Sequence, residues 1–197
     1  MDIRAYLEHT LLRADATSKD IGRLCMEAIQ EKFVAVCVHP SWVKFAKTMV
    51  GSSGVKIATV IGFPLGVNTT EIKVAECLDA LDCGADELDM VIHIGKLHEG
   101  EDLYVAKEIA DVKKAIGDKI LKVIVETSLL SRAEKEKIAQ IVMDNGADYI
   151  KTSTGFSTGG ATIEDVKLFR QIAGDNLKIK ASGGIRDFET AMRMIDA

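Results

Sequence analysis

Short runs rich in β-branched and other apolar residues recur along the chain, and stretches with helical periodicity separate them. We predict a strand at each run: residues 33–39, 55–62, 86–92, 120–127, 148–154 and 177–183. A shorter apolar stretch at 8–12 predicts one more strand ahead of the first helix. The pattern therefore indicates alternating strands and helices, with about seven strands in all.

The predicted helices carry start and stop signals. Three begin with an oxygen-bearing side chain that is followed three residues later by an acid, a pair that can accept hydrogen bonds from the free N–H groups of a first turn. Gly84 and Gly146 stand where two helices would end, each just ahead of a strand, and lie 146 − 84 = 62 residues apart. That distance fits two strand-plus-helix units of roughly thirty residues. The three pairs are Thr17 with Asp20, Asn68 with Glu71, and Ser131 with Glu134.

Repeated βα units form either an open doubly wound sheet or a closed barrel. No GxGxxG motif follows the first strand, which disfavours the nucleotide-binding open sheet. Polar or reactive residues instead stand near the ends of many strands, and a barrel collects those ends at one mouth. We predict one α/β domain over 1–197, a (β/α)8 TIM barrel that lacks its final strand, because the runs give about seven strands and closure needs eight. The strand-end residues are Cys37, Asp89, Glu126, Lys151 and Lys180.

Composition narrows the class of protein. With 47% hydrophobic and 28% charged residues the chain is globular, and its net charge of −5 without a basic block argues against nucleic acid as a partner. The first residues, MDIRAYLEHTLL, resemble neither a signal peptide nor a membrane anchor, so we expect a cytoplasmic protein with no membrane partner. The four cysteines and four histidines show no metal-ligand spacing, and no metal site is predicted.

One lysine stands inside an apolar strand, in YIKTSTGF at 149–156. Burying an ammonium is costly, so Lys151 either lays its stem on apolar surface with its head in water or serves a buried site. Lys180 stands near the end of the next strand, and neighbouring strands lie roughly 4.8 Å apart. Two inward lysines at equal height would lower each other's pKa, and a neutral lysine attacks carbonyl groups. Two solvated lysines remain the alternative interpretation, although the pairing favours a functional one.

Strand alternation places Asp89 on the same face as Glu87 and Val91. If that face points inward, Asp89 can shuttle protons beside an imine-forming amine, or it can merely neutralise Lys180. Gly155 and the turn at 183–186 lie at strand-to-helix junctions, where free backbone N–H groups suit a phosphate. Arg186 in that turn could equally cap its own helix or pair with Asp187.

Seven segments together resemble deoxyribose-phosphate aldolase, the class I aldolase family of deoxynucleoside catabolism. They are HTLL (9–12), CVHP (37–40), IGFPLG (61–66), ELDMVI (87–92), KVIVET (122–127), IKTSTGF (150–156) and IKASGGIR (179–186). The resemblance implies a TIM barrel that reversibly cleaves 2-deoxy-D-ribose 5-phosphate, a small sugar phosphate, to D-glyceraldehyde 3-phosphate and acetaldehyde. It also implies that no metal or organic cofactor is needed, and that the protein is a homodimer.

The same resemblance assigns roles to residues. Lys151 resembles the Schiff-base lysine, Lys180 the neighbour that lowers its pKa, and Asp89 the acid/base partner. The phosphate-binding turns align with Gly155, Gly183, Gly184 and Arg186. Two positions depart from the family pattern: Phe156 stands where some members carry lysine, and Glu8 where aspartate is common.

Three hypotheses stay open beside this interpretation. The barrel could belong to another Schiff-base aldolase or to a phosphosugar isomerase. It could also bind sugar phosphates without catalysis, since fold alone does not decide function. Cys37, at the end of the second predicted strand, is either a packed core thiol or a thiolate that unsaturated aldehydes could trap.

Overall fold

The computed structural model describes residues 2–197, which form one parallel seven-stranded sheet whose strand order follows the chain. All seven predicted strands are confirmed, although most end a few residues early, where the chain turns into the following loop. The strands are β1 (Glu8–Thr10), β2 (Ala35–Val38), β3 (Lys56–Ile61), β4 (Glu87–Val91), β5 (Ile120–Ile124), β6 (Tyr149–Lys151) and β7 (Lys178–Lys180).

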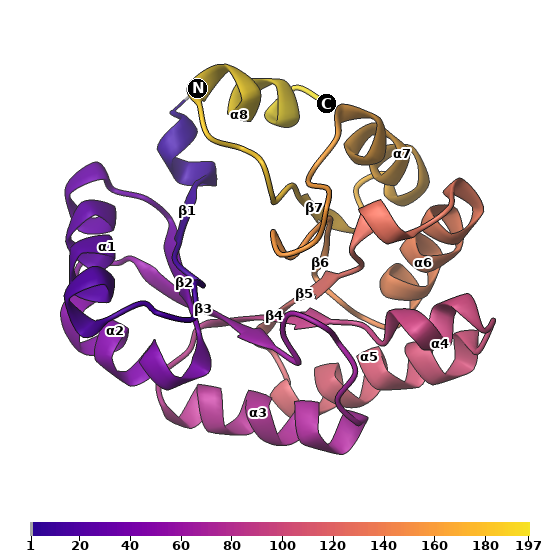
Figure 1. Cartoon of the computed structure of the whole chain (residues 1–197), viewed down its shortest axis with the longest axis horizontal. Helices are drawn as coiled ribbons and strands as arrows, with labels where there is room; N and C mark the ends of the chain where they lie inside the picture. Colours follow the sequence, from indigo (N-terminus) through magenta and orange to yellow (C-terminus); the bar gives the residue numbers. More distant parts are fainter. Residues whose placement is uncertain (1) are drawn as a thin grey trace.

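Helices surround the curled sheet on its outside (Figure 1). Parallel strands need such long crossover connections, and the helices cover the apolar outer face. The α-helices are α1 (Ser18–Glu31), α2 (Val43–Val50), α3 (Thr70–Asp82), α4 (Ile94–His98), α5 (Asp102–Ile116), α6 (Arg132–Asp144), α7 (Ile163–Ala173) and α8 (Phe188–Ile195). Three short 3₁₀ turns are η1 (Ile3–Tyr6), η2 (Pro40–Trp42) and η3 (Thr127–Leu129).

The helix boundaries test the capping predictions. Capping boxes at the starts of α1 and α6 are confirmed, each with reciprocal side-chain and backbone hydrogen bonds. The predicted pair of Asn68 with Glu71 is wrong, because α3 begins one residue later, after Thr69, which makes no side-chain capping bond. Gly84 and Gly146 have φ values of 103° and 80°, so both predicted left-handed helix exits are confirmed.

Alternation along the strands separates two kinds of surface. Leu88 and Met90 of β4 are fully buried in the main hydrophobic core, which lies between the sheet and the helices. Burying each such side chain stabilises the fold by about 1.5–3 kcal/mol. Glu87 and Asp89, on the other face of β4, point toward the interior of the curl, where a lysine of β5 pairs with both. The outer face therefore supplies stability, and the inner face is left for polar groups.

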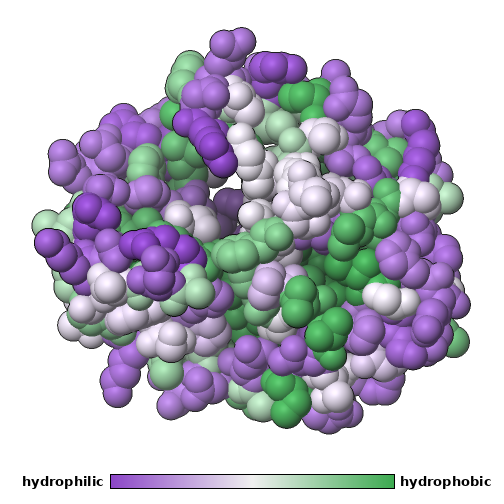
Figure 2. All heavy atoms as spheres, in the orientation of Figure 1, coloured by the Kyte–Doolittle hydropathy of each residue, from purple (hydrophilic) through white to green (hydrophobic). Residues whose placement is uncertain are grey.

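The sheet curls far enough to bring its first and last strands together. Glu8 of β1 and Lys180 of β7 form an ion pair with 3.0 Å between Oε1 and Nζ. The molecule drawn as spheres in the orientation of Figure 1 has a hollow near its centre, and hydrophilic residues cover most of its periphery (Figure 2). The architecture is thus α/β with a barrel-like sheet. Among residues 2–197, no helix has both the length and the apolar character needed to cross a membrane.

Candidate active site

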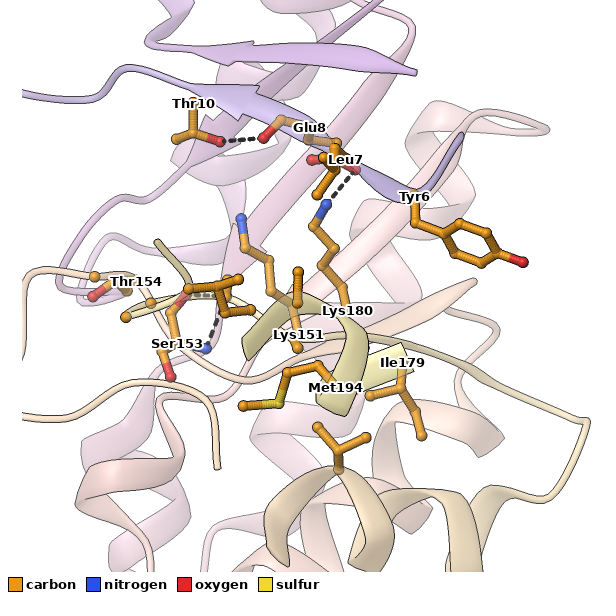
Figure 3. A pocket seen from close by; sticks show the side chains of 18 of the residues that line it. Tyr6, Leu7, Glu8, Thr10, Lys151, Ser153, Thr154, Ile179, Lys180 and Met194 are labelled. Atoms are coloured by element: carbon orange, nitrogen blue, oxygen red, sulfur yellow. Dashed lines mark hydrogen bonds and ion pairs between the residues drawn. The ribbon is translucent and has the colours of Figure 1, made fainter. Parts of the chain in front are cut away.

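Lys151 is the last residue of β6 and points into the curl. Ile150 beside it is fully buried in the outer core, so alternation places Lys151 on the inner face. Lys151 and Lys180 are register partners on β6 and β7 and extend side by side toward β1 (Figure 3). The two predicted lysines therefore do stand at equal height on neighbouring strands.

Asp89 lies directly against Lys151. Its Oδ2 atom is 2.6 Å from Lys151 Nζ, and the two side chains are 0% and 7% exposed. They come from β4 and β6, strands that are separated by β5. The fold therefore brings together Lys151, Lys180 and Asp89, the three residues that the sequence suggested. The Asp89 carboxylate contacts Lys151 and has no access to solvent.

Sequence analysis missed a third lysine of this site. Lys122 of β5 is the register partner of Asp89, and its side chain is 2% exposed. Its Nζ lies 2.9 Å from Asp89 Oδ1, 2.6 Å from Glu87 Oε2 and 3.1 Å from Glu8 Oε1. Lys122 stands inside an apolar strand run, which is the same signal that drew attention to Lys151.

Glu8 connects the two ends of the sheet. Its Oε1 atom accepts from both Lys122 and Lys180, and its side chain is 7% exposed. The glutamate of β1 thus links a lysine of β5 with a lysine of β7.

The charges around the two lysines act differently on their pKa values. Burial favours the neutral form of Lys151, but the adjacent Asp89 carboxylate outweighs it and raises the pKa of Lys151. Burial lowers the pKa of Lys180, and neither Glu8 nor Asp89 offsets it, because Lys122 and Lys151 repel its charge. The predicted role of Lys180, to lower the pKa of Lys151, stays a prediction; in the resting site Asp89 contacts Lys151 directly, and the pKa of Lys151 is raised.

Asp89 is a firmly ionised carboxylate. Burial alone would raise its pKa, but Lys122 and Lys151 hold the pKa of Asp89 well below its usual range. Lys122 in turn is held charged: burial acts to lower its pKa, and the carboxylates of Asp89, Glu8 and Glu87 raise it well above the usual value. The site thus contains a fixed carboxylate beside a lysine that must lose a proton to react.

A cavity of about 650 Å³ opens above the lysines. Lys151, Lys180 and Glu8 line it, together with three glycines, Gly155, Gly183 and Gly184, which have φ values of 82°, 83° and 82°. Glycine adopts such angles without steric cost and lets a ligand approach the backbone. All three glycines that were predicted to contact phosphate therefore border the same space as the lysines.

Arg186 does not join them. It is exposed and does not line the cavity, although Ile185 just before it does. Neither predicted alternative holds in the described chain: Asp187 is the N-cap of α8, and it makes no ion pair with Arg186. Phe156 does line the cavity, and its ring packs edge-on against Phe63 with 5.3 Å between centroids.

Cys37 lies beneath the lysines without access to solvent. It is fully buried in a small cluster with Leu12, Ala58 and Val60. Burial raises the pKa of its thiol to about 12, with a further contribution from Asp89. This environment favours the packed-thiol interpretation. Within residues 2–197, no group of three His, Cys, Asp or Glu side chains is arranged to hold a metal ion.

Comparison with known proteins identifies the family. A model described as DeoC/LacD family aldolase matches residues 5–196. A Brevibacillus brevis protein named deoxyribose-phosphate aldolase is 52% identical over 197 residues, which cover 100% of this chain and 89% of the relative. A relative with the same name from Lactococcus lactis subsp. cremoris is 50% identical, with 100% and 90% covered.

The chain belongs to the DeoC/LacD aldolase family. It is therefore a carbon–carbon lyase, and the predicted resemblance is confirmed. Solved structures agree with this: a protein described as QR15, an aldolase, is 39% identical, has a TM-score of 0.96 and is matched over 100% of this chain and 88% of its own. An Aeropyrum pernix deoxyribose phosphate aldolase, described as tetrameric, is 30% identical, with a TM-score of 0.88 and coverages of 98% and 82%.

For a DeoC/LacD aldolase, the site has the chemical groups that carbon–carbon cleavage needs. A buried amine can form an imine, an adjacent carboxylate can move protons, and glycine turns offer backbone N–H groups to an anion. The amine and the glycine turns line the cavity, and the carboxylate, which is fully buried, contacts the amine.

Proposed function

We propose that this DeoC/LacD aldolase reversibly cleaves 2-deoxy-D-ribose 5-phosphate to D-glyceraldehyde 3-phosphate and acetaldehyde through an imine on Lys151. The observation that carries the proposal is the buried contact of 2.6 Å between Asp89 Oδ2 and the Nζ of Lys151, a lysine that lines a cavity with glycine turns. The names of the relatives at about half identity support this choice of substrate.

The reaction needs a neutral amine. Asp89, 2.6 Å from Nζ, accepts the proton as Lys151 attacks the C1 carbonyl of the open-chain sugar. Loss of water from the carbinolamine leaves a cationic imine. The C2–C3 bond then breaks: its electron pair moves toward the imine to form an enamine, and the C3 hydroxyl loses its proton as glyceraldehyde 3-phosphate forms. Protonation at C2 and hydrolysis release acetaldehyde and restore the amine.

Lys180 has a second role in the proposal. Its lowered pKa makes it the lysine that exchanges a proton most easily, and its side chain is 17% exposed and lines the cavity. We assign it to proton transfer at the sugar hydroxyl and to the stabilisation of negative charge there. Asp89 keeps the cationic imine in place by charge attraction.

The phosphate is assigned to the glycine turns. Gly155, Gly183 and Gly184 border the cavity, and residues with positive φ in succession form concave sets of N–H groups that bind anions. The net charge of −5 supplies no general attraction for phosphate, so recognition depends on this local geometry. Arg186 has no part in the proposal.

We also propose that the functional barrel has eight strands, with one more strand between β7 and β1. These strands lie at the two ends of the described sheet, and closed barrels of this kind have eight. A chain extended by the C-terminal segment of the Brevibacillus brevis relative should melt several degrees higher than the present one. An unchanged melting temperature would count against an eighth strand.

A homodimer in the cytoplasm, working without a metal or organic cofactor, completes the proposal. Light scattering tests the oligomer, and a tetramer, as described for the Aeropyrum pernix relative, is the alternative outcome. Full activity after treatment with a chelator and desalting is the result expected of a cofactor-free enzyme.

Borohydride trapping tests the central step. Protein incubated with acetaldehyde or the sugar phosphate and then reduced should gain mass on a peptide that contains Lys151, and the Lys151→Leu variant should not. An increment on Lys180 instead would reverse the roles of the two lysines. No increment in folded protein would favour a barrel that only binds sugar phosphates. An imine without acetaldehyde release would favour another aldolase or an isomerase.

A further inference from the structure

Glu126, which follows β5, has an unusual backbone conformation. Its φ and ψ angles are 53° and 68°, in the left-handed region that residues other than glycine rarely adopt. Lys32 is the other such residue between 2 and 197, and it ends helix α1 as a left-handed cap. Glu126 has no capping role of that kind, so its conformation needs a different explanation.

The hydrogen bonds on either side show how the chain accommodates Glu126. The Val125 N–H donates to the Lys151 carbonyl at 3.0 Å, and the Thr127 N–H donates to the Thr152 carbonyl at 2.9 Å. The two donors, Val125 and Thr127, are two residues apart in the chain, whereas the two acceptors, Lys151 and Thr152, are consecutive. Glu126 is therefore an extra residue on the β5 side, as in a β-bulge. Bulges redirect side chains, and many stand next to active sites.

The redirected carboxylate binds the turn that follows Lys151. Glu126 Oε2 accepts from the Thr154 N–H at 3.0 Å and also from the Thr154 hydroxyl. The Thr154 oxygen in turn accepts from the Phe156 N–H at 3.1 Å. Glu126 is 2% exposed, and in the described chain it forms no ion pair. The other oxygen, Oε1, accepts from the Ser128 hydroxyl at 3.3 Å, so this buried carboxylate without a cation joins the segment after β5 to the turn after β6.

These contacts determine which N–H groups of the turn stay free. Thr152 donates to the Lys180 carbonyl, and Ser153 donates to a serine hydroxyl at 3.3 Å. Thr154 and Phe156 are occupied as described above. Gly155 is the residue of 152–156 whose N–H has no acceptor within the described chain, and Gly155 lines the cavity.

Unsatisfied polar groups gather at the same place. Two buried side-chain atoms in residues 2–197 lack a hydrogen-bond partner, Thr127 Oγ1 and Ser153 Oγ. One is adjacent to Glu126 and the other to Thr154. The left-handed conformation of Glu126 and the two unpartnered hydroxyls each reduce stability, and all three lie within one small region. Strained and unsatisfied groups that cluster in this way are typical of functional sites.

We propose that Glu126 is a positioning residue for phosphate recognition: its carboxylate fixes the turn at 154–156 so that the Gly155 N–H stays free for the phosphate of the substrate. The inference rests on the proposed function, because it assumes that this turn binds phosphate. It differs from a purely structural role in one respect. Loss of the carboxylate weakens the binding of phosphorylated substrates and leaves imine formation at Lys151 unchanged.

Two substitutions distinguish the contribution of the Glu126 carboxylate from that of the backbone conformation at this position. Glu126→Gly removes the side chain, and glycine adopts a φ of 53° without strain. Glu126→Gln keeps an oxygen that can accept from Thr154. Glu136→Gln is the matched control, since Glu136 lies half-exposed on α6 and pairs only with Arg132.

The measurements are kcat and KM for 2-deoxyribose 5-phosphate and for 2-deoxyribose, together with the rate of borohydride-trapped imine formation from acetaldehyde. For Glu126→Gly we expect KM for the phosphorylated sugar to rise about tenfold, as for the loss of one strong hydrogen bond. Its kcat, the kcat/KM for 2-deoxyribose and the trapping rate should stay within about twofold of the parent values. Glu126→Gln should restore most of the affinity, and the control should match the parent.

Equal losses on both sugars, or an unchanged KM, would overturn the proposal. If Glu126→Gly does not fold, Thr154→Val removes both bonds of the hydroxyl, the one to Glu126 and the one from the Phe156 N–H, and keeps the bond from the Thr154 N–H to the carboxylate. The same selectivity for phosphorylated substrate must then appear. If the parent forms no imine, calorimetric affinity for inorganic phosphate still decides. Weaker binding by the variant supports Glu126 even though the proposed function has failed, and equal binding rejects it.

Discussion

Lys151 Nζ and Asp89 Oδ2 lie 2.6 Å apart, and both side chains are almost completely withdrawn from solvent. The contact stabilises the ammonium form, so the resting site holds its candidate nucleophile protonated and its candidate base ionised. In the proposed mechanism, attack on the carbonyl requires this proton to move along the existing contact to Asp89, and dehydration of the carbinolamine then uses the same proton.

Replacing Asp89 should slow turnover and change the pH range in which Lys151 forms an imine. In Asp89→Asn, no carboxylate accepts the Lys151 proton, and we expect kcat to fall by about 10²–10⁴. Burial would then lower the pKa of Lys151 against the weaker effect of Glu8 alone among the carboxylates, so residual imine trapping should persist to lower pH than in the parent. Trapping rates from pH 5 to pH 9 measure both effects. Asp111→Asn, an exposed carboxylate on α5 that pairs with Lys107, is the control and should behave as the parent does.

Acid should destabilise the protein through the same network. The folded-state pKa values of Asp89 and Glu8 are lowered, so their contribution to stability is complete above the unfolded values of about 4 and is lost as pH falls further. Urea unfolding at pH 7, 4 and 3 should show a loss that is concentrated below pH 4. Asp89→Asn should start less stable by about 3–5 kcal/mol at pH 7 and decline less steeply. Parallel pH profiles for the two proteins would contradict this assignment.

Lys122 should be essential to the fold although it does not line the cavity. Lys122→Met removes a buried cation from among three carboxylates, and we expect a loss of about 3–5 kcal/mol in the free energy of unfolding. Lys107→Met, which removes an exposed partner of Asp111, should leave the unfolding transition unchanged. Chemical denaturation at pH 7 compares the two. Similar midpoints for both variants would mean that Lys122 does not hold the carboxylates together.

Cys37 should resist electrophiles. Burial raises its pKa to about 12, so very little thiolate exists at neutral pH, and solvent does not reach the sulfur. Cys83, which is partly exposed, should be alkylated first by iodoacetamide, as peptide mass mapping would show. In concentrated aldehyde, Cys37→Ala and the parent should lose activity at the same rate. Slower inactivation of the variant would instead support trapping of the thiol.

Much of the fold could be predicted because the signals are local. Apolar runs located all seven strands, and two of the three capping pairs marked a helix start. Asn68 failed as a cap because a threonine one residue further along occupies the N-cap position of α3. Which of two neighbouring polar residues occupies the N-cap position depends on the geometry of the preceding loop, and residue type does not reveal that geometry.

The site was predicted less completely. Lys151, Lys180 and Asp89 stand out because charge interrupts an apolar strand, and Lys122 carried the same signal without being singled out. The direction of the Lys151 pKa depends on which neighbour is nearer, Asp89 or Lys180. Arg186 could not be placed either, because the sequence does not show that it is exposed while Ile185 just before it lines the cavity.

The sequence by itself determined the alternation of strands and helices and indicated the aldolase family, because hydrophobic periodicity and local motifs survive without coordinates. The tertiary structure decided that the lysines point inward. The tertiary structure alone decided which charges meet. Glu8, Glu87, Asp89 and Lys122 come from three strands and join only because the sheet curls and the strands keep a fixed register. It also decided the left-handed turn at Glu126, since such strain persists only where contacts distant in the chain hold it.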